Sequence, residues 1–153
     1  MNALRLFIFA ALSGLLISAT SAFALDRFVS SGADKLVIKG YATTSYFSDG
    51  TPKQGSAAHT VTWKGVNWRF ATAADAVKFK ANPSAFAPQF GAYCTGGLSQ
   101  RHVVTGNPKI WRMHKGKLYL FFARAGAKRF DRDPEGTIAK ASAFWKTLDV
   151  KDR

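Results

Sequence analysis

Residues 68–94, WRFATAADAVKFKANPSAFAPQFGAYC, decide the fold because a strand pattern and a helix pattern follow one another there. The stretch opens on alternation: Trp68 and Phe70 face one side of an extended chain and the charged residue between them faces the other, as in a half-buried strand. A second candidate strand, residues 59–63, precedes it through Lys64-Gly65. Glycine at the second turn position suits a two-residue turn that needs positive φ, so we expect a β-hairpin.

The same stretch predicts a helix after the hairpin. Thr72 and Asp75 have the spacing of a capping pair, in which a hydroxyl accepts the backbone N–H three residues further on. We therefore expect a helix over residues 73–81, with Phe79 on its inward face. A proline ends this helix, and residues 83–86 are expected to form a short second turn.

A second hairpin is predicted downstream. Residues 110–114 and 118–122 are rich in apolar and aromatic side chains, and Lys115-Gly116 between them repeats the turn chemistry of the first hairpin. The density of apolar residues over 118–122 predicts a central strand that is covered on both faces. His114 lies at the hairpin tip, where we expect an exposed side chain.

The rest of the chain adds shorter elements and a C-terminal helix. Residues 36–38 are a strand candidate, residues 40–47 an irregular extended piece and residues 49–52 a turn. Asp133-Pro134-Glu135 is a strong helix start. A buried stripe at helical spacing follows it: Ile138, Ala141, Trp145 and Leu148. Together these patterns predict a small α+β domain with antiparallel hairpins packed against helices.

The first 24 residues have the pattern of a secretory signal peptide. A positively charged start, an apolar run over residues 6–17 and the small-residue site Ala22-Phe23-Ala24 follow in order. We expect cleavage after Ala24, which leaves one domain over residues 25–153 in the periplasm or outside the cell. The apolar run is shorter than the roughly 20 residues of a membrane span, and no transmembrane segment is expected in the mature chain.

The chain is strongly basic. Its 22 Lys and Arg residues against 9 Asp and Glu residues give a net charge of +13, which indicates contact with anionic partners. The cations are spread along the chain, and they are densest over residues 109–117 and 124–132. Export argues against nucleic acid. The expectations that remain are a solvated basic surface or one that binds anionic lipid or envelope polymers.

No catalytic motif is present and the few carboxylates form no evident pair, so an enzyme is not favoured and no catalytic residue is expected. The donors left for chemistry are one cysteine and three histidines: Cys94, His59, His102 and His114. A thiolate with imidazoles suits copper or zinc, or a nucleophile with its base. A helix over residues 92–102 would bring Cys94 and His102 to one face, although each residue of Gly96-Gly97 opposes it by about 1 kcal/mol. A buried, inert Cys94 remains an alternative.

Five segments have the order and spacing of one family: residues 39–47 (KGYATTSYF), 68–94, 106–111 (GNPKIW), 116–120 (GKLYL) and 138–145 (IAKASAFW). In these segments the chain resembles the exported YHS domain-containing (seleno)proteins, over nearly all of the expected mature chain. The resemblance implies a YHS-like fold. It also implies an association with metal, because other YHS domains occur beside metal-transport and metal-sensing proteins and are associated with metal binding through cysteines.

The cysteines of that family signature are missing here. The signature resembles F-C-S-x-x-C-x-x-x-F followed by N-P; this chain keeps the frame, while Ala71 and Asp75 replace both cysteines. The branch element G-x-Y-C is kept as residues 91–94, and some members carry selenocysteine, which implies redox or soft-metal chemistry. A further departure is Ala42-Thr43-Thr44, where relatives commonly have Asp-Pro-Val after Gly-Tyr.

The leading hypothesis is an exported YHS-like module that binds a soft metal, copper or zinc, or a small ligand at Cys94, with Tyr93 and His102 as further binding residues. The first alternative is a non-catalytic cell-envelope protein whose basic surface binds anionic lipid or polymer. The second is a single-cysteine thiol redox protein. In that case Cys94 would need an external thiol, because the chain has no second cysteine.

Overall fold

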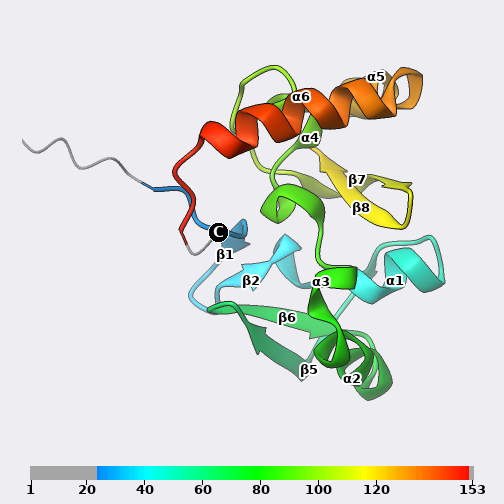
Figure 1. The fold of residues 1–153 in the computed structure, drawn as a ribbon. Helices are drawn as coiled ribbons and strands as arrows, with labels where there is room; N and C mark the ends of the chain where they lie inside the picture. Colours follow the sequence, from blue (N-terminus) through cyan, green and yellow to red (C-terminus); the bar gives the residue numbers. More distant parts are fainter. Residues whose placement is uncertain (1–23, 152–153) are drawn as a thin grey trace, which may run out of the picture.

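The computed structural model describes residues 24–151, which form one small α+β domain with antiparallel hairpins packed against helices (Figure 1). Most of the signal peptide predicted over residues 1–24 lies outside the described residues. Within residues 24–151, no helix combines the length and apolarity needed to cross a bilayer. The two ends of the described chain meet, since Leu25 donates to Asp149 O at 2.8 Å and accepts from Lys151 N at 3.0 Å.

The first predicted hairpin is confirmed as β5 (Ser56–Trp63) and β6 (Val66–Phe70). The joining Lys64-Gly65 has positive φ at both residues, as this turn requires. β6 also pairs in parallel with β2 (Leu36–Val37), which pairs with β1 (Ser30–Ser31), and the sheet order is β1-β2-β6-β5. The strand predicted over 36–38 is thus part of this sheet at residues 36–37, whereas Ile38 begins a short 3₁₀ helix.

The predicted helix after the hairpin is confirmed as α2 (Ala73–Ala81), with α3 (Pro83–Phe86) behind it. Thr72 caps α2: its hydroxyl accepts the N–H of Asp75 at 3.1 Å and donates to the carboxylate of the same residue at 2.7 Å. Phe79 is fully buried on the inward face. α2 packs against β5 and β6 through that face (Figure 1).

The first core lies between the four-stranded sheet, α2 and the second hairpin. Its large members are Phe28, Tyr46, Trp68, Phe70, Phe79, Leu118 and Leu120. Aromatic rings dominate it, and the rings of Trp68 and Phe79 lie 5.0 Å apart. Such aromatic pairs contribute about 0.5–1.5 kcal/mol beyond the burial of their area.

Residues 40–47 do not form the irregular extended piece that the sequence predicts. Most of this segment is helical, because burial of its side chains outweighs the extended preference of its β-branched residues. Tyr46 is the clearest case: it is buried, and its hydroxyl donates to Pro108 O at 2.7 Å. The elements here are η1 (Ile38–Gly40), β3 (Tyr41–Ala42), α1 (Thr43–Ser48) and β4 (Lys53–Gln54).

The second predicted hairpin is confirmed as β7 (Asn107–His114) and β8 (Lys117–Phe121), but β8 is not a central strand because its sheet has two strands. Both of its faces are nevertheless covered, as predicted. Leu118 and Leu120 reach the first core, and the residues that alternate with them reach a second core beneath the C-terminal helices. β8 is therefore apolar because it lies between two cores.

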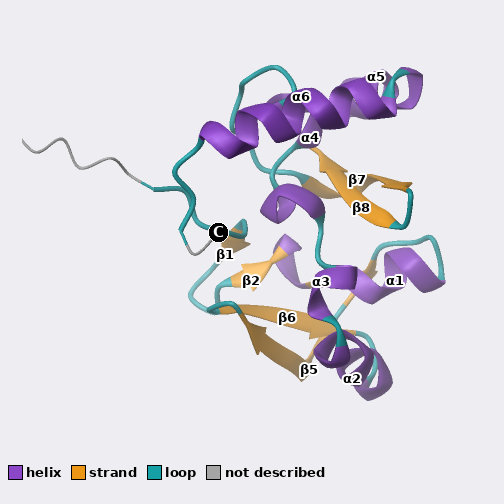
Figure 2. Cartoon of the chain, in the orientation of Figure 1, coloured by secondary structure: helices purple, strands orange, loops and turns teal. Residues whose placement is uncertain are grey.

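Helices α4 (Thr95–Leu98), α5 (Arg124–Arg132) and α6 (Pro134–Thr147) pack beside the second hairpin (Figure 2). α6 begins as predicted, since the carboxylate of Asp133 accepts the N–H of Gly136 at 2.8 Å. Its predicted buried stripe packs inward. α5 is not predicted by the sequence patterns.

His114 is not simply exposed at the hairpin tip, as the sequence predicts. Its Nε2 lies 2.9 Å from Glu135 Oε1, its ring stands edge-on to Phe130 at 5.8 Å, and 24% of the side chain is exposed. Lys115 pairs with the same carboxylate at 2.5 Å. Hydrogen bonds from Lys115, which has the larger effect, and from His114 hold the pKa of Glu135 below its usual range. These contacts tie the hairpin tip to the start of α6.

Candidate functional site

Cys94 lies where the chain passes from one short helix into the next. The 3₁₀ helix η2 (Gln89–Ala92) precedes it, and α4 follows with Cys94 as its N-cap. The backbone is fixed there, because the N–H of Cys94 donates to Val104 O at 2.8 Å. Only 4% of the residue is exposed. Cys94 is thus largely buried, and its sulfur has a defined position.

The sulfur of Cys94 accepts two backbone hydrogen bonds. The nitrogens of Gly97 and Phe122 lie 3.2 and 3.1 Å from Sγ, and their N–H dipoles complement an electron-rich sulfur. The second donor lies beside α5, which packs very closely on α4: a Cβ built on Gly96 would come within 3.3 Å of Gly126 Cα. Close packing of two glycines therefore brings the Phe122 N–H to the sulfur.

A shallow hollow of about 350 Å³ opens over this sulfur, and we call it the Cys94 hollow. Its lining comes from α4, the loop after it and α5, and includes Gly97, His102, Val104, Phe122 and Arg129. The rim is apolar, and Phe122 is 63% exposed. Cys94 and His102 share this hollow although the predicted helix over 92–102 is absent, since α4 ends at Leu98 and the loop then returns.

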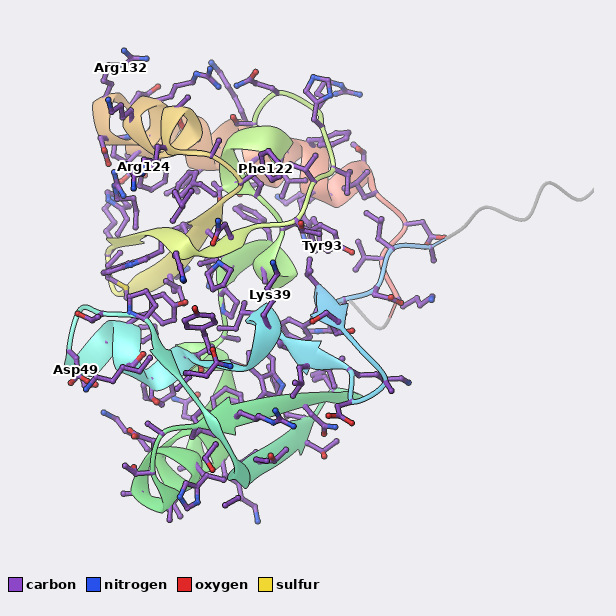
Figure 3. The ribbon with its side chains drawn as sticks, turned by 180° about the vertical axis from the view of Figure 1, so that it is seen from behind. Lys39, Asp49, Tyr93, Phe122, Arg124 and Arg132 are labelled. Carbon is purple, nitrogen blue, oxygen red and sulfur yellow. The ribbon has the colours of Figure 1, made fainter. Side chains whose placement is uncertain are left out.

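Tyr93 does not line the Cys94 hollow. Its ring packs against Trp145 at 5.6 Å, and its hydroxyl donates to Asp26 O at 3.1 Å. Figure 3 labels Tyr93 beside the N-terminal segment. Burial, with a smaller effect of the Asp26 carboxylate, raises the pKa of Tyr93. Its contacts hold the N-terminal segment against α6.

The donor set at the Cys94 hollow is small. Among residues 24–151, no three His, Cys, Asp or Glu side chains lie together so that they could hold a metal ion. His59 lies on β5 and His114 is engaged at the second hairpin's tip, which leaves the Cys94 sulfur as a soft donor and the His102 imidazole as a borderline donor at the hollow. Four-ligand tetrahedral zinc does not fit this set, whereas a soft ion held by few donors does.

A second feature is a basic groove of about 380 Å³ between β7 and α5. Its cationic lining residues are Lys109, Arg112, Arg124 and Lys128. Arg112 binds Asp131 through bonds of 2.6 and 2.7 Å, and this guanidinium holds the pKa of that carboxyl below its usual range. The other three cations have no carboxylate partner within the described part of the chain. Figure 3 shows Arg124 and Arg132 along the same helix.

The sequence patterns do not identify the residues that α5 adds to the hollow and to the groove. These are Arg129 at the hollow, and Arg124 and Lys128 at the groove. The available signal is the density of cations over residues 124–132, which indicates charge but no geometry. No family model matches the chain, and no curated protein or solved structure matches it.

Proposed function

We propose that this protein is an exported YHS-like module that holds a small soft ligand at Cys94. The main support is that two N–H groups, from Gly97 and Phe122, are directed at the Cys94 sulfur, and that this sulfur lies beneath an open hollow. The Gly97 bond also caps α4, but a cysteine that only fills space or caps a helix needs neither the second donor, Phe122, nor the opening. Export and the YHS-like type are supported by the signal-peptide pattern and the five family segments.

The ligand that suits this geometry best is copper(I). Cys94 supplies a thiolate donor and His102, on the same hollow, an imidazole. Soft sulfur ligands select copper(I), which is satisfied by fewer donors than the four that structural zinc takes. Val104 and Phe122 add apolar side chains to the rim of the hollow beside these two donors.

The loss of the family's usual cysteines agrees with a site elsewhere in the fold. Ala71 and Asp75 occupy those positions at the start of α2, and Asp75 is engaged there with Thr72 in capping the helix. Neither residue supplies a thiolate. Cys94 is then the residue on which soft-ligand chemistry depends.

Cys94→Ser is expected to abolish copper(I) binding, because it removes the soft sulfur donor. His102→Asn is expected to weaken binding at least tenfold, about 1.4 kcal/mol, because it removes the imidazole donor. The measurement is an anaerobic competition of the mature protein with a chromophoric copper(I) chelator. His59→Asn is the matched control: it changes a histidine outside the hollow and should leave the affinity unchanged.

Retention of copper(I) by Cys94→Ser would contradict the proposal. Equal weakening by His102→Asn and His59→Asn would remove His102 from the site. The unfolding midpoint of each variant is recorded alongside, so that loss of the ion is separated from loss of the fold.

The basic groove supports a second function, adhesion to anionic lipid. Arg124 and Lys128 are four residues apart on one helix, and like charges at this spacing destabilise a helix. Lys109 adds a third cation across the groove, and the nearby Asp131 is already bound to Arg112. The uncompensated positive charge is what an anionic headgroup would neutralise.

Arg124→Gln/Lys128→Gln is expected to weaken binding to phosphatidylglycerol-containing vesicles about thirtyfold, since each cation near such a surface contributes about 1 kcal/mol. Co-sedimentation at rising salt gives the measurement, and binding should fall as salt screens the charges. Lys80→Gln/Lys140→Gln removes the same charge from two other helices and is the control. Equal weakening by both pairs would show that net charge, and not the groove, binds the vesicle.

A further inference from the structure

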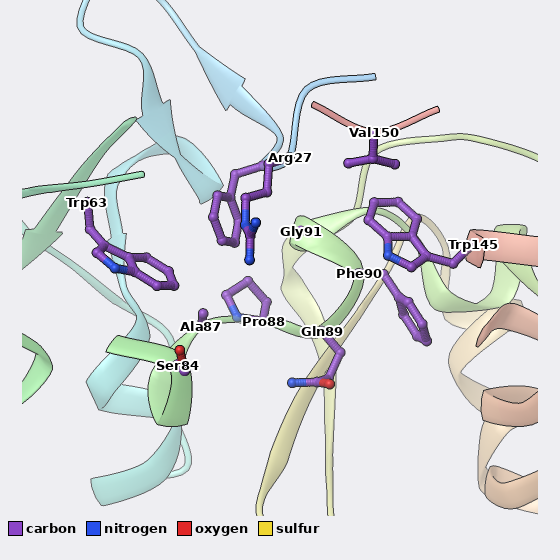
Figure 4. A pocket seen from close by; sticks show the side chains of 11 residues that line it. Arg27, Trp63, Ser84, Ala87, Pro88, Gln89, Phe90, Gly91, Trp145 and Val150 are labelled. Atoms are coloured by element: carbon purple, nitrogen blue, oxygen red, sulfur yellow. The ribbon is translucent and has the colours of Figure 1, made fainter. Parts of the chain in front are cut away.

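An aromatic cleft of about 220 Å³ shares no lining residue with the Cys94 hollow or the basic groove. Figure 4 shows its two walls, with Trp63 on one side, Phe90 and Trp145 on the other, and Pro88 between them. Each wall is a packed aromatic pair: Trp63 lies 5.4 Å from Phe28, and Phe90 lies 6.0 Å from Trp145. Each wall joins two residues that are far apart in the sequence, so the cleft is assembled by the tertiary fold.

Arg27 extends into this aromatic cleft. In Figure 4 its side chain runs between the two walls, with the guanidinium near Pro88. Arg27 is half-buried and lies over the ring of Phe28, 5.8 Å from its centroid. Among the residues that the structure describes, no carboxylate lies within ion-pair distance of it. A guanidinium that has lost part of its hydration without gaining an anion is stabilised when an anion arrives.

The backbone that carries Arg27 is fixed on both sides. Asp26 O accepts the hydroxyl of Tyr93 at 3.1 Å, and the N–H of Val29 donates to Gly91 O at 2.8 Å. The N-terminal segment lies so close to η2 that a Cβ on Gly91 would come within 1.8 Å of Arg27 O. The side chain is therefore presented from a rigid platform, which reduces the entropy lost on binding.

We propose that the aromatic cleft binds a small aromatic carboxylate. A guanidinium and a carboxylate are planar partners that can form two parallel hydrogen bonds, and the aromatic walls favour a planar ring between them. The cleft is smaller than the usual sites for drug-sized ligands, about 300–1,000 Å³, which limits the ligand to about one ring. Ser84 and Gln89 at the cleft supply further polar groups for a ring substituent.

Benzoate and its neutral isostere benzamide test this proposal on the mature protein by two-dimensional NMR titration. Benzoate should bind saturably, shift the indole N–H signals of Trp63 and Trp145, and bind at least tenfold more tightly than benzamide. Arg27→Gln should remove that tenfold preference. Arg101→Gln is the matched control, because its guanidinium also lies over a ring, 5.0 Å from the centroid of Phe144, outside the cleft. It should keep the preference.

Three outcomes would overturn the proposal: equal affinity for benzoate and benzamide, a preference that survives Arg27→Gln, or benzoate shifts confined to the basic groove. The unfolding midpoint of Arg27→Gln is measured beside the titration, and an unchanged midpoint assigns any lost preference to the guanidinium. Repeating the titration in Cys94→Ser should give the same result. The cleft and the Cys94 hollow are thus tested separately.

Discussion

Gly91→Ala is expected to lower the free energy of unfolding by about 3 kcal/mol or more, because two separate penalties add. Gly91 has φ of +60°, and an alanine held in this left-handed region costs about 1–2 kcal/mol. The new Cβ would also stand 1.8 Å from Arg27 O, so the N-terminal segment or η2 must move. That movement disrupts the 2.8 Å bond from Val29 N to Gly91 O. Urea unfolding of the protein measures the loss.

Gly116→Ala separates the two penalties. Gly116 has φ of +68°, yet a Cβ there has nothing within 4 Å, so its loss should be limited to the conformational penalty of about 1–2 kcal/mol. The difference between the two variants measures the close approach at Gly91. Equal losses of stability in the two variants would show that the N-terminal segment does not lie against η2. The inference that a rigid backbone presents Arg27 would then be wrong.

The hairpins and capped helices could be predicted because their determinants are local. Alternation over residues 66–70 and the turn at Lys64-Gly65 each depend on neighbours in sequence, as does the Thr72 cap. α1 and α5 lack such signals. In α1, burial of Tyr46 overrides the extended preference of its neighbours. α5 has no side-chain cap at Ala123, and only two of its residues are buried.

The candidate site was predictable only in part. The sequence identifies Cys94 by its uniqueness. It pairs His102 with Cys94 through a helix that does not form, since α4 ends at Leu98 and a loop brings His102 to the hollow. It also places Tyr93 beside them, whereas Tyr93 faces Asp26 and Trp145. The Phe122 N–H that reaches the sulfur lies 28 residues further along the chain. Its approach depends on the packing of two helices, which no local pattern encodes. The aromatic cleft is non-local in the same way.

Phe79→Ala is expected to lower the free energy of unfolding by about 3–5 kcal/mol, the usual range for removing a fully buried phenylalanine. Phe79 is 0% exposed, and its ring lies 4.9, 5.0 and 5.9 Å from those of Phe70, Trp68 and Trp63. It is also the only residue of α2 that is fully buried. Its loss leaves a cavity in the first core and removes the main contact that holds α2 to the sheet.

Val77→Ala is the matched control on the same helix, because Val77 is 69% exposed and its change should stay within about 0.5 kcal/mol. The two variants also probe the aromatic cleft, since Trp63 forms one cleft wall and packs on Phe79. Benzoate binding should therefore weaken in Phe79→Ala and persist in Val77→Ala, under conditions where both are folded. A similar loss of stability in both variants would mean that α2 is held by its exposed face, contrary to the packing described.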